Sequence, residues 1–356
     1  MTSDVVAAVR EVAASVFAAA DMSGDGFDAT SWRSLEAAGF TRLTVPDSAG
    51  GGGAGLDVAA AVLFEAGAHA VRVPLAETDL LAGWLLAGAG IALPAGPLTA
   101  VAAVAAVQDD LDISRDGDGW RIRAKLSGVP WARCAAGVAV LTPRLVALLD
   151  TCQVVPGTCQ VVPGSNLAGE PRDTVVIDGV VGADAIAEAD AAAAGHELRL
   201  RAALARTQLL AGALSATLSA AVRYAGERTQ FGRPLGRFQA VQQQLALAAG
   251  EVAAACSAAE AAAAAATRAG VTAQESVIAI ASAKARASEA ASTVAAIAHQ
   301  VHGAIGFTRE HPLRVLTTRL WAWRDEDGSD AYWNGVIGAR ALSLGPAGLW
   351  PMLTGT

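Results

Sequence analysis

Charged side chains are scarce in this sequence. They make up 17% of its 356 residues, against roughly 25% in an ordinary soluble domain, whereas hydrophobic residues make up 53%. So little charge leaves much of the chain for burial, in its own core or between subunits, and we therefore expect an oligomer. A chain of this length also exceeds one compact core, which predicts two or three packed subdomains.

Long apolar runs and a basic leader are also missing. The longest apolar stretches, such as residues 261–266, are alanine tracts interrupted by Glu260 and Arg268, well short of the ~18 strongly apolar residues of a membrane span. The N-terminus has no basic segment followed by an apolar core, and Asp4 falls where a signal peptide would be uncharged. The sequence therefore predicts no membrane segment and a cytoplasmic protein.

Excess positive charge and paired cysteines are absent too. The formal net charge of -8 would repel a polyphosphate backbone, which argues against nucleic acid. Two cysteines fall in a tandem copy, residues 151–157 and 158–164, which we interpret as a repeated strand and turn because Pro-Gly ends each Val-Val run. No Cys-x-x-Cys pair occurs, so free thiols are expected at Cys134, Cys152, Cys159 and Cys256.

The first third of the chain is predicted to be helical. Valines recur at helical spacing over residues 5–16, and Asp28 offers a cap before Trp32. The glycine run at residues 50–53 then interrupts the pattern before a new helix near Leu56. This run is not a phosphate loop, because no Gly-Lys-Ser/Thr follows it.

The middle and last thirds of the chain differ in their residue patterns. From about residue 98 to 178, short β-branched runs alternate with turn signals, which predicts a β domain. The pattern is helical after residue 189, with a capping box at residues 272–275 ahead of a long helix that reaches about His302. The fold class is therefore α+β, with a helical domain at 1–97, a β domain at 98–188 and a helical bundle at 189–356.

Two segments stand out from the alanine-rich background of the last third. In the first, Arg228 and Gln230 precede a turn at Gly232, and a guanidinium with amides beside a glycine turn could bind a phosphate diester. A helix connection with a salt-bridged Arg228 is the alternative, because helix C-termini attract arginine.

The second segment runs from His299 to Leu313. His299 and His302 are three residues apart and could bind a metal with His311 or Glu310 as a third ligand. No further ligand cluster exists, and the glycines indicate a close backbone approach instead, so we expect no metal.

Together these segments resemble the C-terminal signatures of acyl-CoA dehydrogenases: an Arg-x-x-Phe-Gly turn with a downstream Phe-Gln, then Gln-x-x-Gly-x-x-Gly-Phe. The N-terminal third adds Trp32, Gly39-Phe40 and Val45-Pro46, similar to that family's entry helices. The resemblance covers nearly the whole chain. It implies an N-terminal helical domain, a middle β-barrel domain and a C-terminal four-helix bundle.

The resemblance also implies a chemistry. It is that of an FAD-dependent oxidoreductase acting on an acyl-CoA thioester, in fatty acid or sterol side-chain catabolism, with an electron-transferring flavoprotein as acceptor. The family's FAD is shared across a subunit interface. Carried over by motif, Arg228 would pair with the FAD pyrophosphate and Gln300 and Gly303 would contact the adenosine of a neighbouring subunit's FAD; the remaining cofactor contacts would be Gln230, Phe231 and Gln239.

The middle domain departs from the family's pattern. The usual Thr-Glu-Pro-x-x-Gly-Ser-Asp stretch is absent, since residues 98–112 offer only Thr99, Gln108, Asp109 and Asp110. The Trp-Ile-Thr or Trp-Ile-Ser run, whose hydroxyl serves the flavin N5, has only Trp131 followed by Ala132-Arg133. Trp131 is a candidate for stacking on the flavin, and an ordinary core tryptophan is equally compatible with the sequence.

The catalytic base is also altered. The spacing after Pro312 places Asp327 where the family's commonest pattern has its glutamate, and Ser329 where the family has a flavin-contacting threonine. An aspartate retracts the carboxylate by about 1.5 Å, and a misplacement of about 1 Å can cost about a hundredfold in rate. Glu326 could substitute, and a merely solvated charge run at residues 324–327 is the alternative. The family's other base position is occupied by Arg201.

Two functions remain compatible with these residues. The leading prediction is that the chain desaturates an acyl-CoA with Asp327 as its own base, because the spacing from Pro312 to Asp327 fits the family's pattern without a gap. It could instead be a non-catalytic or half-site subunit that completes a heteromer with a second acyl-CoA dehydrogenase-like chain, which the missing Thr-Glu-Pro stretch favours. A flavin-free scaffold is disfavoured because Arg228 and Gln300 both keep their motif glycines.

Overall fold

The computed structural model describes residues 3–20, 26–103, 111–150, 159–308 and 311–354. These residues pack into two compact units. The helical unit comprises Met1–Gly24, Leu56–Val71 and Ala203–Thr356, and the sheet unit comprises Asp25–Gly55 and Arg72–Ala202. The three-domain division by element type stays a prediction.

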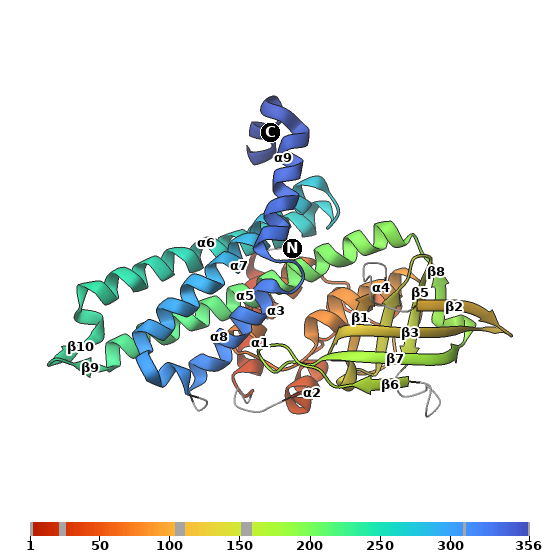
Figure 1. Ribbon diagram of the computed structural model, residues 1–356, viewed down its shortest axis with the longest axis horizontal. Helices are drawn as coiled ribbons and strands as arrows, with labels where there is room; N and C mark the ends of the chain where they lie inside the picture. Colours follow the sequence, from red (N-terminus) through yellow and green to blue (C-terminus); the bar gives the residue numbers. More distant parts are fainter. Residues whose placement is uncertain (1–2, 21–25, 104–110, 151–158, 309–310, 355–356) are drawn as a thin grey trace. The chain divides into compact units, whose positions relative to one another are not determined.

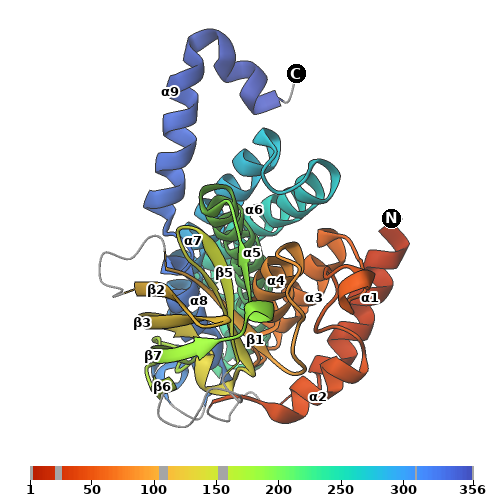
Figure 2. The same ribbon diagram turned by 90° about the vertical axis from the view of Figure 1, so that its right-hand side faces the viewer.

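The helical unit is built on long helices, of which α6 and α7 lie side by side (Figure 1). The last helix, α9, bends at Gly345, which has a φ of 65°, and the bend is visible at the top of Figure 2. The helices of this unit are α1 (Ser3–Phe17), α3 (Leu56–Ala68), most of α5 (Ala191–Glu227), α6 (Gln239–Ala269), α7 (Gln274–His302), α8 (Pro312–Asp325) and α9 (Asp330–Thr354).

Helices α3 and α5 touch through their backbones. A Cβ added at Gly212 of α5 would overlap the carbonyl oxygen of Phe64, and one added at Gly67 of α3 would overlap that of Leu209. Because Gly67 and Gly212 have no side chain, the two helices can approach closely at this crossing.

This crossing makes Gly212→Ala a sensitive test of the packing. The added methyl group has no space, and overpacking of this kind costs about 1–3 kcal/mol. Chemical denaturation should therefore show a lower free energy of unfolding. Gly250→Ala in α6 is the matched control: it faces open space, so the better helix propensity of alanine should raise stability by about 0.5–1 kcal/mol. Equal effects of the two substitutions would contradict the close contact.

The sheet unit contains two four-stranded sheets, with strand orders β1-β4-β5-β8 and β2-β3-β7-β6. Its strands are β1 (Leu98–Ala102), β2 (Leu111–Asp116), β3 (Gly119–Pro130), β4 (Gly137–Leu141), β5 (Leu145–Asp150), β6 (Cys159–Val162), β7 (Arg172–Val181) and β8 (Ile186–Glu188). Its helices include α2 (Ala29–Ala37) and α4 (Trp84–Gly88).

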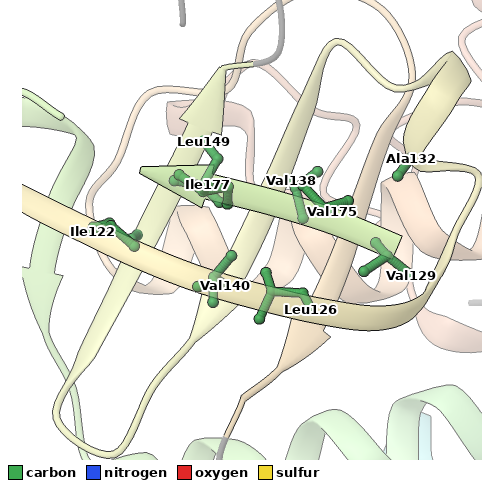
Figure 3. Close-up of a cluster of buried hydrophobic side chains, with 11 residues drawn as sticks. Ile122, Leu126, Val129, Ala132, Val138, Val140, Leu149, Val175 and Ile177 are labelled. Carbon is green, nitrogen blue, oxygen red and sulfur yellow. The ribbon is translucent and has the colours of Figure 1, made fainter. Parts of the chain in front are cut away.

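Alternate residues of these strands fill one apolar core. Figure 3 shows side chains from β3, β4, β5 and β7 meeting there, among them Ile122, Leu126, Val140, Leu149 and Ile177. Burial in β7 alternates from residue to residue, as one buried face of a strand requires. The expected β-barrel is wrong, because hydrogen bonding between the described strands ends at β1 and β8 in one sheet and at β2 and β6 in the other, leaving two open sheets.

Local predictions have mixed outcomes. The cap is confirmed, since the Asp28 side chain accepts hydrogen bonds from the backbone N–H groups of Thr30 and Ser31. The capping box at residues 272–275 is wrong: Ala273 precedes α7 and no side chain caps it. Three thiols are free as expected, those of Cys134, Cys159 and Cys256. The first tandem copy, with Cys152, lies outside the described residues.

One helix in the described part of the chain, α6, is long and apolar enough to cross a membrane by length and composition alone. It packs along α7 and α3 in the helical unit. A helix of a soluble bundle passes the same test, so this observation is weak evidence for a membrane segment.

Candidate functional site

The predicted phosphate-binding segment forms an exposed hairpin after α5. Strands β9 (Thr229–Gln230) and β10 (Arg233–Pro234) pair antiparallel, with Phe231 and Gly232 in the turn at φ values of 52° and 79°. Leu235 donates its backbone N–H to the carbonyl of Arg228 at 2.8 Å, which closes the hairpin onto the end of α5. Arg228, Gln230, Phe231 and Gln239 are all exposed.

The Arg228 guanidinium is available to a ligand. It forms no ion pair within the described ranges, so the salt-bridged helix connection considered for this residue does not occur there. Arg233 lies over the ring of Phe238 at 4.2 Å, and Phe231 meets the same ring edge-on. These aromatic contacts hold the hairpin while Arg228 remains exposed.

The second predicted segment lines a pocket of about 480 Å³ at the end of α7. Gln300 and Gly303 are on its wall, and Gly303 has a φ of 64° with open space where a Cβ would lie. His299 stacks between Phe307, at 4.2 Å, and Trp321, at 5.4 Å, measured between ring centroids. Sequence reasoning did not single out Trp321, since nothing in α8 relates it to α7.

The histidines of this segment are engaged in other contacts. His299 Nε2 and the Thr317 hydroxyl form a hydrogen bond of 2.9 Å, and burial lowers the pKa of this imidazole. His302 donates from Nδ1 to the Ala298 carbonyl at 2.8 Å and stacks on Tyr224. Glu310 lies outside the described residues. The described residues hold no group of three side chains that could bind a metal.

The turn that carries Asp327 faces a buried arginine. Arg206 of α5 donates from Nε to Asp327 Oδ2 at 2.9 Å, and its Nη2 lies 3.3 Å from Glu326 Oε2. The Arg206 side chain is only 7% exposed. Asp325 instead points to solvent and pairs with Arg324, so a solvated charge run describes Asp325 but not its two neighbours.

The backbone of this turn is fixed at several points. Asp327 and Gly328 have φ values of 56° and 96°, and the Trp333 indole donates to the Asp327 carbonyl at 3.0 Å. The fully buried Lys284 donates to the Gly328 carbonyl at 2.7 Å. The Ser329 hydroxyl accepts the backbone N–H of Tyr332 and caps α9. Arg206 and Lys284 were not predicted, because each lies far along the sequence from the turn.

In the sheet unit, the residues that replace the family's flavin-edge run are buried or paired. Trp131 is 3% exposed with a φ of 56°, and Ala132 is 1% exposed. Arg133 donates from Nε to Asp173 at 2.9 Å. Thr99 is buried in β1, and Gln108, Asp109 and Asp110 lie outside the described residues.

The family's other base position also lacks a carboxylate. Arg201 lies over the ring of Trp84 at 4.6 Å and pairs with Glu197 at 2.8 Å. Burial lowers the pKa of this guanidinium, although Glu197 opposes the shift. The charge at this position is therefore opposite to that of a base.

Sequence similarity to known proteins identifies the family of this chain. Residues 198–342 match the family model for the acyl-CoA dehydrogenase C-terminal domain. The chain is 33% identical over 310 residues to acyl-CoA dehydrogenase IpdE2 of Mycobacterium tuberculosis, covering 85% of this chain and 83% of that protein. The chain belongs to the acyl-CoA dehydrogenase family. Its members are flavoprotein oxidoreductases.

Solved acyl-CoA dehydrogenases share this fold. The ChsE4-ChsE5 complex of Mycobacterium tuberculosis contains a chain that is 24% identical, with a TM-score of 0.84 and coverage of 97% of this chain and 99% of that one. A chain of the steroid acyl-CoA dehydrogenase Tcur3481-Tcur3483 is 26% identical, with a TM-score of 0.80 and coverage of 96% and 98%. The predicted fold class and family are thus confirmed.

Proposed function

We propose that this chain acts in the FAD-dependent α,β-dehydrogenation of an acyl-CoA as the half-site subunit of a heteromer, whose second acyl-CoA dehydrogenase-like chain supplies the catalytic base. The observation that carries this proposal is the ion pair of Arg206 with Asp327 and Glu326. Both candidate bases share one buried guanidinium.

A general base must offer a free carboxylate oxygen to the proton it removes. Arg206 already takes Asp327 Oδ2 and lies against Glu326, and its side chain is almost fully buried. Removal of a substrate proton by either acid would compete with its contact to this guanidinium. The acids at the family's base position therefore serve to hold Arg206 and the turn.

The flavin edge of the sheet unit supports the same proposal. The family's hydroxyl is replaced by Ala132, which is buried, and the guanidinium of Arg133 is bonded to Asp173. Neither residue supplies a hydrogen bond to a flavin ring nitrogen in this arrangement. Trp131 could contribute only ring packing.

The helical unit, in contrast, fits the other end of FAD. The exposed Arg228 with Gln230 and the uncovered backbone at Gly232 suit a diphosphate, because guanidinium and N–H donors match its oxygens. The pocket at Gln300 and Gly303 has room and aromatic walls for an adenosine. FAD would supply the hydride acceptor, and these residues of the chain would bind its polyphosphate and adenosine ends.

The solved neighbours described above suggest the partner chain and the substrate class of this protein. Two solved neighbours are named as pairs of unlike chains, and one of these pairs is a steroid acyl-CoA dehydrogenase. We therefore place a ring-bearing, steroid-type acyl-CoA first among the substrates to test, with an electron-transferring flavoprotein as acceptor in the cytoplasm.

A second candidate function retains Asp327 as the chain's own base. Its side chain is 27% exposed, and it lies at the family's base position in a turn with an unusual backbone conformation. In that case Arg206 would orient the carboxylate rather than occupy it, and Glu326 would be the substitute base.

The chain is expected to form an assembly with a partner rather than a functional monomer. One chain leaves Leu342 85% exposed and Trp350 70% exposed on α9, and much of the alanine-rich α6 uncovered. Light scattering of the purified chain should give the mass of a dimer or a tetramer. Purified alone, the chain should hold little FAD, and mixing with a family chain that carries the Thr-Glu-Pro stretch should restore stoichiometric flavin. A monomer with stoichiometric FAD would contradict the proposal.

A further inference from the structure

Lysine is nearly absent from this chain, and one of its two lysines is fully buried. The sequence contains 26 basic residues of the lysine and arginine types, of which only Lys125 and Lys284 are lysines. Lys125 is exposed on β3, whereas Lys284 on α7 has no exposed surface. Since burying an ammonium is costly, this site must satisfy it with good partners.

All three protons of the Lys284 ammonium have an acceptor. Its Nζ donates to the Ser288 hydroxyl at 3.0 Å, to the Arg324 carbonyl at 2.9 Å and to the Gly328 carbonyl at 2.7 Å. Ser288 in turn donates to the same Arg324 carbonyl at 2.9 Å. A compact ammonium suits three convergent oxygens better than the planar fork of an arginine does.

The two carbonyls lie on either side of the acidic turn. Arg324 is in the last turn of α8, where a cation is favoured by the helix dipole, and Gly328 comes just before α9. Between them Asp327 has a positive φ, which costs free energy in a residue other than glycine and persists only where the surroundings hold it. Lys284 thus binds both ends of the turn to α7, while Arg206 binds its side chains.

We infer that Lys284 is a positioning residue, which fixes the turn of residues 326–329 and thereby sets where Asp327 and Ser329 lie. This inference rests on the proposed function in two respects: Ser329 is taken to face the flavin, and FAD affinity is measured in the two-chain assembly. Ser329 directly follows the carbonyl that Lys284 holds, so a release of Gly328 moves the Ser329 hydroxyl first.

The hydrogen bonds of Lys284 to the turn depend on pH. Burial lowers the pKa of Lys284 to about 8, although the Asp327 carboxylate opposes the shift. The charged groups that face it are Arg206 from α5 and the acids Asp325, Glu326 and Asp327 of the turn. A neutral amine has two N–H groups for three acceptors, so above a pH of about 8 the two carbonyls of the turn and the Ser288 hydroxyl compete for them, and the bonds that hold the turn weaken.

The two lysines allow a direct measurement. In the chain labelled with ¹³Cε-lysine, NMR should show two signals, and the Lys284 signal should titrate well below ~10.4, the ordinary pKa of a lysine. The Lys125→Met variant assigns them. FAD affinity of the assembled two-chain enzyme should fall by up to about tenfold between pH 7 and pH 9.5, the factor expected for losing one neutral hydrogen bond, here from the Ser329 hydroxyl to the flavin.

Lys284→Met removes the donors at similar volume. It should weaken FAD binding at pH 7 and abolish the pH dependence, whereas Lys125→Met should change neither. Ser288→Ala removes one acceptor and should lower the titration midpoint of Lys284, which remains measurable if Lys284→Met does not fold. Simple loss of stability would not remove the pH profile of FAD binding.

Two results would overturn the inference. One is a Lys284 signal whose titration midpoint lies at the ordinary pKa of a lysine, ~10.4. The other is FAD affinity that stays constant across the titration of Lys284. Neither result depends on whether the isolated chain oxidises acyl-CoA, so failure of the proposed function is recognised separately, by flavin bleaching.

Discussion

Acyl-CoA added to the isolated chain, reconstituted with FAD, is expected to leave the flavin oxidised. The reason is the ion pair of Asp327 with the buried Arg206, which binds Asp327 Oδ2 at the family's base position. A positioned general base contributes about 10²–10⁴-fold to rate, so its loss should place bleaching below detection. Flavin absorbance after mixing with a panel of acyl-CoA thioesters, steroid-type ones included, measures this directly.

The assembled two-chain enzyme gives the sharper comparison. In the proposed two-chain enzyme, Asp327→Asn should change turnover per bound FAD by less than about twofold, whereas removal of a working base would lower it by about 10²–10⁴-fold. Asp325→Asn is the matched control, because that carboxylate is exposed and pairs with Arg324 rather than with Arg206. Bleaching of the isolated chain that disappears in Asp327→Asn would establish Asp327 as the base and refute the half-site proposal.

Arg228→Ala should weaken FAD binding in the assembled enzyme by about 10-fold to 150-fold. A hydrogen bond to a charged group contributes about 1.5–3 kcal/mol, and each 1.4 kcal/mol is tenfold in affinity. The Arg228 guanidinium is exposed and forms no ion pair within the described ranges, so its removal should leave folding intact. Titration with FAD, followed by fluorescence quenching, measures the loss.

The control for Arg228 is an arginine of the same unit with a different environment. Arg268 is exposed and pairs with Glu275 at 3.1 Å, a surface contact of little energetic value. Arg268→Ala should therefore leave FAD affinity unchanged. Equal FAD affinity in Arg228→Ala and wild type would remove Arg228 from the cofactor site.

Features set by neighbouring residues could be predicted from the sequence. The Asp28 cap, the turn at Gly232 and the end of α7 at His302 each depend on a few adjacent residues, whose backbone preferences are local. The strands around Trp120 and Val138 could be read in the same way, because β-branched residues alternate there with turn signals.

Features that depend on residues far apart in the sequence could not be predicted from it. Arg206 and Asp327 are 121 positions apart, and Lys284 is 44 positions from Gly328, so no sequence pattern connects them. The open sheets differ from the expected barrel because closure depends on how edge strands meet, which single-strand patterns do not encode. At residues 272–275 the capping pattern was present, but α7 begins after Ala273 without using it.

The pairing of Arg206 with two acids bears on how this chain could change over generations. Asp327→Glu alone would lengthen the side chain but leave the guanidinium beside it. Loss of Arg206 alone would leave Glu326 and Asp327 without their cation, next to a strained turn. A working base therefore requires two substitutions, and either one taken first gives a protein that is no more active or is less stable. If the chain is the half-site subunit that we propose, this arginine would make its dependence on a partner's base difficult to reverse by single mutations.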